Sequence, residues 1–131
     1  MGVNAFSSGV TANVTLTTTT ETVVATVSNV GTPRAGCKVI LRGWTQITTG
    51  TNTTALTVRV RRGTTITDPL VGEANPEQVE AAAGSTEAID FAFEESPGEL
   101  ASASYVLTVQ QTAASADGTA LQSELTVEVL T

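Results

Sequence analysis

The side chains that could take part in covalent catalysis are few in this chain of 131 residues. The sequence has no histidine, a single cysteine (Cys37) and a single lysine (Lys38). Catalysis by a Ser–His–Asp or Cys–His pair is excluded, because no imidazole is present to act as the base. Lys38 lacks the Ser-x-x-Lys spacing of a serine–lysine site. Cys37 stands beside strand-like apolar residues, so we expect it to be a small core residue. The sequence therefore predicts no catalytic residue and no enzyme.

Four carboxylates follow one another closely: Asp90, Glu94, Glu95 and Glu99. A pair of carboxylates is the machinery of most glycosidases, and several together can hold Ca²⁺. The chain has only one tryptophan and one tyrosine to offer a sugar, however, and it contains no EF-hand-type loop. The single cysteine and the missing histidine disfavour a zinc or copper site. The missing glycine-rich motif disfavours a phosphate-binding loop. We expect these carboxylates to lie on a solvated outer face, and we predict no metal and no cofactor.

The charges are sorted along the chain. Residues 1–62 contain all six cations and one anion, Glu21, and so carry +5. Residues 63–131 contain the other twelve anions and carry −12, which gives the net charge of −7. This pattern is typical of a protein that docks on another surface. A net negative surface repels phosphate, so we predict no direct contact with nucleic acid.

The basic residues allow two interpretations. Arg59 and Arg61 are expected on one strand face, where they could pair with acids of neighbouring strands such as Glu128 or Asp90. Alternatively they form a patch for an acidic partner, because the planar guanidinium group suits carboxylates. Trp44, on a face with Arg42, is either a core residue or an interface anchor. The candidate partner-binding residues are Arg34, Arg42, Arg59, Arg61, Arg62, Phe6 and Trp44.

The elements that must position these side chains are strands. Threonine is in excess, and apolar residues alternate with it at period two, as in an antiparallel sheet with one wet face. The alternating runs are 10–16, 21–27, 37–48, 53–62, 87–94, 103–112 and 119–130, separated by glycine, proline or Asp-Gly turns. Gly43 is expected to mark a bulge that makes room for the indole of Trp44. Leu121, Leu125, Val127 and Val129 are the core positions expected in the last run.

These seven runs, with a further strand possible in residues 75–84, make about eight strands and predict an all-β fold: one antiparallel β-sandwich or jelly roll over residues 10–131, with little or no helix. Residues 1–9 are expected to form an extended N-terminal arm, which either frays or reaches a neighbouring subunit through Phe6. Residues 75–84 fit either a two-turn helix or a strand. The sequence shows neither a signal peptide nor an apolar stretch of about 18 residues, so we predict no membrane contact and synthesis in the cytoplasm.

Three runs carry a resemblance to a known class: Cys37–Trp44, Leu56–Thr64 and Tyr105–Gln111. Together with the strand and loop organisation over about residues 21–131, they resemble the jelly-roll decoration (head-stabilising) proteins that sit as trimers on bacteriophage capsids. The resemblance implies a homotrimer assembled through sheet faces, with the major capsid protein as partner and the virion capsid surface as location. Two alternatives stay open: a phage tail, neck or fibre-tip jelly-roll protein, and a carbohydrate-binding, lectin-like module with an exposed Trp44 or Tyr105.

Overall fold

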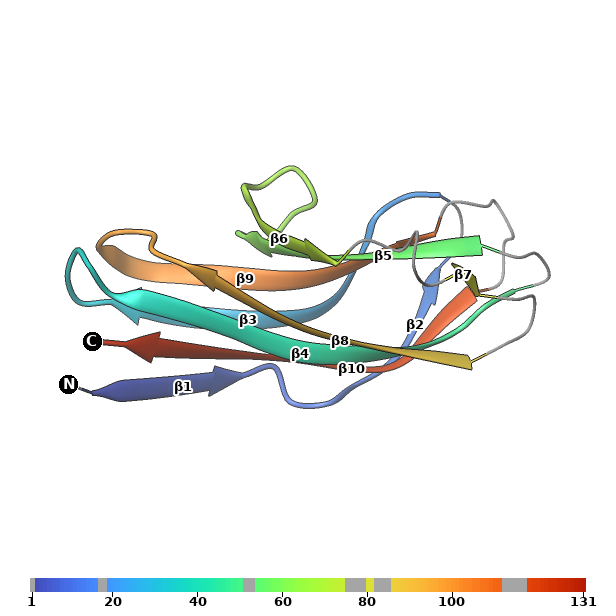
Figure 1. Cartoon of the computed structure of the whole chain (residues 1–131), viewed down its shortest axis with the longest axis horizontal. Coiled ribbons are helices and arrows are strands. Elements are labelled where there is room, and N and C mark those ends of the chain that lie inside the picture. The colour runs from blue at the N-terminus through green and yellow to red at the C-terminus, as the bar shows by residue number, and fades with distance from the viewer. Residues whose placement is uncertain (1, 17–18, 51–53, 75–79, 82–85, 112–117) are drawn as a thin grey trace.

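The computed structural model describes residues 2–16, 19–50, 54–74, 80–81, 86–111 and 118–131. These residues form ten strands and no helix (Figure 1). The strands in chain order are β1 (Val3–Ser7), β2 (Thr11–Leu16), β3 (Thr22–Thr32), β4 (Lys38–Thr48), β5 (Thr54–Arg62), β6 (Leu70–Ala74), β7 (Glu80–Ala81), β8 (Thr86–Glu95), β9 (Leu100–Gln111) and β10 (Gly118–Leu130). No helix in the described part is therefore long and apolar enough to cross a membrane.

Two antiparallel sheets of five strands each form a sandwich (Figure 1). In the first, called here the β10 sheet, β10 lies between β4 and the two short strands β1 and β2, and β8 pairs with the other side of β4. In the second, the β9 sheet, β9 lies between β3 and β5, and β6 and β7 both pair with β5. All pairings are antiparallel, as the alternating sequence pattern predicts.

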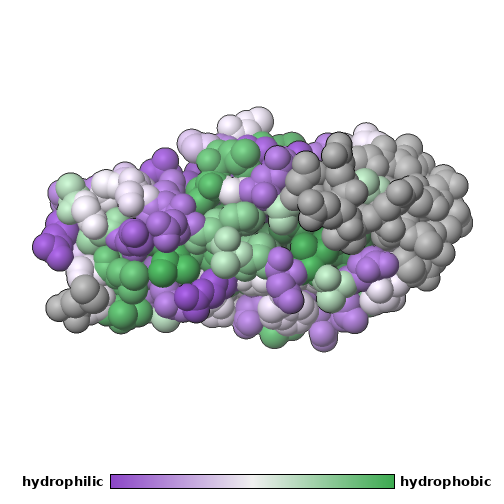
Figure 2. Space-filling view, viewed as in Figure 1, coloured by the Kyte–Doolittle hydropathy of each residue, from purple (hydrophilic) through white to green (hydrophobic). Residues whose placement is uncertain are grey.

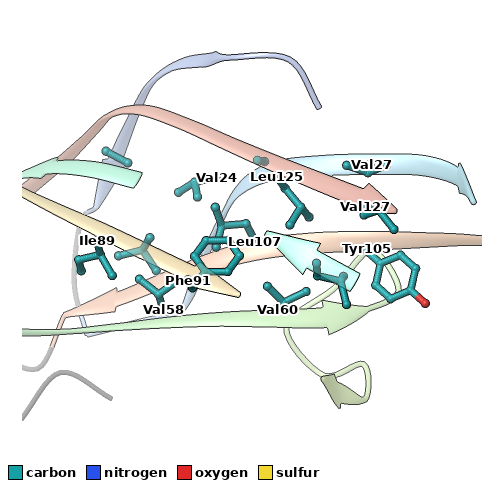
Figure 3. Packing of buried hydrophobic residues seen from close by; sticks show 14 of the residues in the cluster. Val24, Val27, Val58, Val60, Ile89, Phe91, Tyr105, Leu107, Leu125 and Val127 are labelled. Atoms are coloured by element: carbon teal, nitrogen blue, oxygen red, sulfur yellow. The ribbon is translucent and has the colours of Figure 1, made fainter. Parts of the chain in front are cut away.

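The core lies between the two sheets and is built from small branched side chains (Figure 3). Alternation at period two sends every second residue of a strand inward. The two central strands supply residues that are completely buried: Tyr105, Leu107 and Val109 from β9, and Leu125, Val127 and Val129 from β10. The predicted all-β sandwich is thus confirmed.

Three details differ from the sequence-based expectation. Gly43 faces the core, and a Cβ there would lie 2.2 Å from the Glu124 carbonyl oxygen and 2.6 Å from the Phe91 ring. Its missing side chain therefore makes room for Phe91, whereas Trp44 faces outward. Leu121 is only half-buried, because the register shifts between Ala120 and Gln122 and sends Ala120 and Ser123 inward in its place.

The third difference is the number of strands, which is ten in the described residues. Two of the additional strands, β1 and β6, lie in segments that lack clear alternation. Within residues 75–84, for which the sequence fits either a helix or a strand, the structure describes only Glu80–Ala81, which form β7. The other residues of this segment lie outside the described residues. The division into an arm (1–9) and a domain (10–131) stays a prediction, and Val3–Ser7 of that arm pairs with β10 of the same chain.

The two ends of the chain lie at the same end of the sandwich (Figure 1). The backbone N–H of Thr131 donates to the carbonyl of Gly2 at 3.0 Å, and the N–H of Gly2 donates to Oγ1 of Thr131 at 3.0 Å. The first of these bonds continues the β1–β10 ladder by one residue on each strand, and the second adds a side-chain contact at the same point.

Candidate functional site

The outer face of the β9 sheet carries a carboxylate shared by two arginines. Glu21 Oε2 accepts from Arg61 Nε at 2.7 Å, and Glu21 Oε1 accepts from Arg61 Nη2 at 2.9 Å. Arg59 Nη1 donates to the same Oε1 at 3.1 Å, and the Thr108 hydroxyl donates to Oε2 at 2.8 Å. The Glu21 side chain is 9% exposed and the two arginines are 19% and 16% exposed. This group therefore covers part of the sheet instead of projecting from it.

The strand order explains why these residues meet. Arg59 and Arg61 alternate on β5 and share its outer face, and Arg59 lies opposite Thr108 of β9. On the other side of β9, Thr108 lies opposite Val23 of β3. Glu21 immediately precedes β3, so its side chain reaches across β9 to the arginines of β5.

The pKa of Glu21 lies below its usual value. Burial alone would raise the pKa, because it removes water from the charged form. The hydrogen bonds from Arg61 and Thr108 and the charges of Arg61 and Arg59 outweigh that effect. Glu21 is therefore ionised in the folded protein at neutral pH and holds both arginines in place.

Three of the other four cations, Lys38, Arg42 and Arg62, also have partners within the described residues. Arg59 donates from Nε to Glu73 at 2.6 Å, and Arg62 Nε lies 3.4 Å from Oε1 of Glu95. Lys38 and Glu94 are 3.3 Å apart, and Arg42 and Glu128 are 3.5 Å apart. Among the residues that the structure describes, Arg34 is the one cation without an ion pair.

These contacts decide how the basic residues are held but not whether they bind a partner. Internal pairing occurs, yet the acids expected for Arg59 and Arg61, Glu128 and Asp90, are not the ones used. Glu128 pairs with Arg42, and Glu21 is the partner that the sequence reasoning missed. The available signal was that Glu21 is the one anion within the basic half of the chain. The assignment of Arg34, Arg42, Arg59, Arg61, Arg62, Phe6 and Trp44 to partner binding stays a prediction.

Tyr105 is buried, and its hydroxyl donates to Oε2 of Glu95 at 2.8 Å. Burial is the main reason why the pKa of Tyr105 is raised, and the hydrogen bond to Glu95 adds to it. Since Arg62 binds the other oxygen of Glu95, the three groups link β5, β8 and β9 at one end of the sandwich. The ring lies in the core (Figure 3), so it offers no surface to a sugar.

The outer face of the β10 sheet has a different character. Trp44 of β4 is half-buried on this face, directly opposite Asp90 of β8 and Glu124 of β10. The side chains of Lys38, Arg42 and Glu94 on this face are 49%, 58% and 63% exposed. This sheet face is therefore open to solvent, and the charged groups on it remain accessible.

The described residues form hollows that are shallow and open. One of about 440 Å³ is lined by Asn4 and Phe6 of β1 and by residues around Thr32 and Leu100, so Phe6 lies partly against the core and partly in this hollow. Another of about 340 Å³ is lined by Arg34 and Lys38 beside Thr131. No group of three or more carboxylates or cysteines in the described part is arranged to hold a metal ion. On the side that it presents, Figure 2 shows apolar residues in separate patches among hydrophilic ones.

No protein-family model matches the chain, and no curated protein matches its sequence. Solved structures resemble it in fold. A structure of infectious bursal disease virus, Gx strain, gives a TM-score of 0.63 at 11% identity, over 97% of this chain and 31% of that chain. The VP2 subviral particle of infectious bursal disease virus gives a TM-score of 0.62 at 10% identity, over 98% of this chain and 32% of that chain. The chain thus spans about a third of the length of these viral proteins and shares with that third a jelly-roll-like sandwich.

Proposed function

We propose that this protein is a non-enzymatic structural protein of a virus particle and acts as a decoration, or cement, protein on a bacteriophage capsid. The observation that carries the proposal is the fold: almost the whole chain superposes on part of a viral protein found in assembled particles. The charge sorting and the lack of histidine in the sequence agree with a protein that binds other proteins and transforms nothing.

In this role the chain works as a homotrimer bound to the major capsid protein. Each subunit makes a modest contact with the capsid, and the trimer raises the effective concentration of the second and third contacts once the first has formed. A rigid sandwich suits this task, because little conformational entropy is lost when it binds. The open face of the β10 sheet, with Arg42 and Trp44, is the surface we assign to such contacts.

The shared arginines of the β9 sheet have a different part in this proposal. Because Glu21 holds Arg59 and Arg61 in a largely buried arrangement, breaking those contacts to bind an acidic partner would leave charges unpaired. We therefore assign these two residues to the stability of the fold and assign partner contacts to the more exposed Arg34 and Arg42.

The proposal is tested by the mass of the purified protein in solution and by imaging of particles. Light scattering is expected to give a mass about three times that of the single chain. Virus particles made with this chain are expected to show additional density on the outer capsid surface by cryo-electron microscopy, and particles made without it to release their nucleic acid at lower temperature. A stable monomer that never binds particles contradicts the proposal. Density at a tail, neck or fibre tip supports the alternative structural role.

A further inference from the structure

The outer faces of the two sheets differ in how accessible their charged side chains are to a partner. On the β9 sheet, Thr108 is completely buried beneath Glu21, and the arginines that bind Glu21 are mostly buried too. On the β10 sheet, Lys38 and Arg42 are about half exposed. A partner that binds a sheet face therefore finds more accessible side chains on the β10 sheet than on the β9 sheet.

Trp44 occupies the middle of this open face. Its neighbours Gly43 and Thr45 face the core, so the indole faces outward. The register places Asp90 directly opposite it on one neighbouring strand and Glu124 directly opposite it on the other. Adjacent strands are about 4.8 Å apart, so the two carboxylate-bearing strands are about 10 Å apart with the indole between them.

Neither carboxylate is neutralised within the described part of the chain. Asp90 is exposed and takes part in no ion pair there, and Glu124 accepts only a long hydrogen bond of 3.5 Å from the Ser7 hydroxyl. The two cations on the same face are engaged elsewhere, Lys38 with Glu94 and Arg42 with Glu128. The surroundings of Trp44 therefore keep an excess of negative charge.

We propose that Trp44, Asp90 and Glu124 form a docking site for an arginine or lysine side chain of a partner protein. A cation placed over the face of an indole is attracted by the ring, and the flanking carboxylates add charge-assisted hydrogen bonds. The net charge of −7 steers a basic segment toward the protein before contact is made. The partner is thus basic at this point, which is the opposite of the acidic partner predicted from the arginines in the sequence.

This inference rests on the proposed function for the identity of the partner, a capsid protein, and on the geometry for its chemistry. The chemistry is tested separately with a peptide. The probe is a twelve-residue peptide of alternating arginine and glycine, with a control peptide that has citrulline in place of arginine. Because Trp44 is the only tryptophan in the sequence, its fluorescence reports directly on this site. We expect a saturable change with the arginine peptide, weakened by salt, and none with the citrulline peptide.

Two variants and a matched control locate the binding. The double change Asp90→Asn and Glu124→Gln keeps the size of both side chains and is expected to weaken peptide binding about tenfold or more. Glu99→Gln removes one charge from an exposed carboxylate away from this face and is expected to change the affinity less than twofold. Trp44→Phe is followed by isothermal titration calorimetry and is expected to weaken binding, while circular dichroism confirms that each variant is folded.

Each possible result bears on one proposal. The docking site is overturned if the arginine peptide causes no fluorescence change. It is also overturned if the double variant and Glu99→Gln lose the same amount of affinity for the peptide. A fluorescence change with neutral glucan oligosaccharides and none with the peptide also overturns it, and favours the carbohydrate-binding alternative. If the peptide binds as expected but the protein never binds capsids, the docking site stands and the decoration role fails. If capsids bind the double variant as well as the original protein, the docking site fails and the decoration role stands.

Discussion

Arg61 and Glu21 form a bidentate ion pair across the outer face of β9, with Nε–Oε2 and Nη2–Oε1 distances of 2.7 and 2.9 Å. The two residues are 40 positions apart in the sequence: Arg61 belongs to β5 on one side of β9, and Glu21 directly precedes β3 on the other side. The pair therefore ties β3 to β5 over a strand that neither residue belongs to. Arg59 and Thr108 bind the same carboxylate, which makes Glu21 the common partner of three side chains.

Replacing Glu21 with glutamine is expected to lower the free energy of unfolding by about 1–3 kcal/mol, because two mostly buried arginines lose a charged partner. Urea unfolding followed by circular dichroism measures the change. The matched control is Glu73→Gln, which removes the more exposed partner of Arg59 and is expected to cost about 0.5 kcal/mol or less. Equal losses in the two variants contradict a central role for Glu21.

Stability is expected to fall in acid in a way that depends on Glu21. Its pKa is depressed in the folded protein, so its contribution is complete above the ordinary value of 4.5 and is lost as the pH falls through the lower folded-state pKa. The pKa of Asp68 is also depressed, mainly by hydrogen bonds from the backbone of Thr65 and Thr64, and acts in the same direction. Melting temperatures measured from pH 7 to pH 2 should stay level at first and then drop below about pH 4.5. In Glu21→Gln the drop should be shallower, and an unchanged curve would show that other groups control it.

Tyr105 should resist ionisation until the protein unfolds. Its raised pKa means that the folded state prefers the neutral phenol, so this contribution is present below the ordinary value of 10.0 and is lost as the pH rises above it. The chain has a single tyrosine, so absorbance near about 295 nm reports on this residue alone. We expect the phenolate signal to appear together with the loss of the β-sheet circular dichroism signal. Ionisation near pH 10 in a protein that is still folded contradicts the buried hydrogen bond to Glu95.

Gly43→Ala is expected to destabilise the fold by about 1–3 kcal/mol, because the new methyl group meets a backbone carbonyl that cannot move without disturbing β10. Thermal unfolding measures the effect. The control is Gln46→Ala, a change on the outer face of the same strand, expected to alter stability by about 0.5 kcal/mol or less. If Gly43→Ala leaves stability unchanged, β10 and Phe91 shift readily to make room for the methyl group.

Alternation at period two predicted the fold class well, because inward and outward positions in a sandwich strand follow directly from side-chain direction. It placed Arg59 and Arg61 on one strand face, and the structure agrees: both lie on the outer face of β5, while Val58 and Val60 between and beside them are buried. It misplaced Leu121, since the register shift between Ala120 and Gln122 falls at this residue and nothing in the local sequence marks the shift.

The ion-pair network was harder to predict, because it depends on strand order. Glu21 and Arg61 meet only because β9 lies between β3 and β5, and no local pattern in the sequence specifies that order. The site around Trp44 depends in the same way on which strands flank β4. Asp90 and Glu124 are 34 residues apart in the chain, yet both lie opposite one indole.

The pairing of Gly2 with Thr131 has a mechanical consequence. β1 begins and β10 ends at this point, and the two strands are antiparallel neighbours. Pulling Gly2 and Thr131 in opposite directions therefore breaks the hydrogen bonds between the strands one after another. If two paired strands are instead pulled along their length, many hydrogen bonds have to break at the same time. Tension applied at Gly2 and Thr131 would therefore separate β1 from β10 at low force.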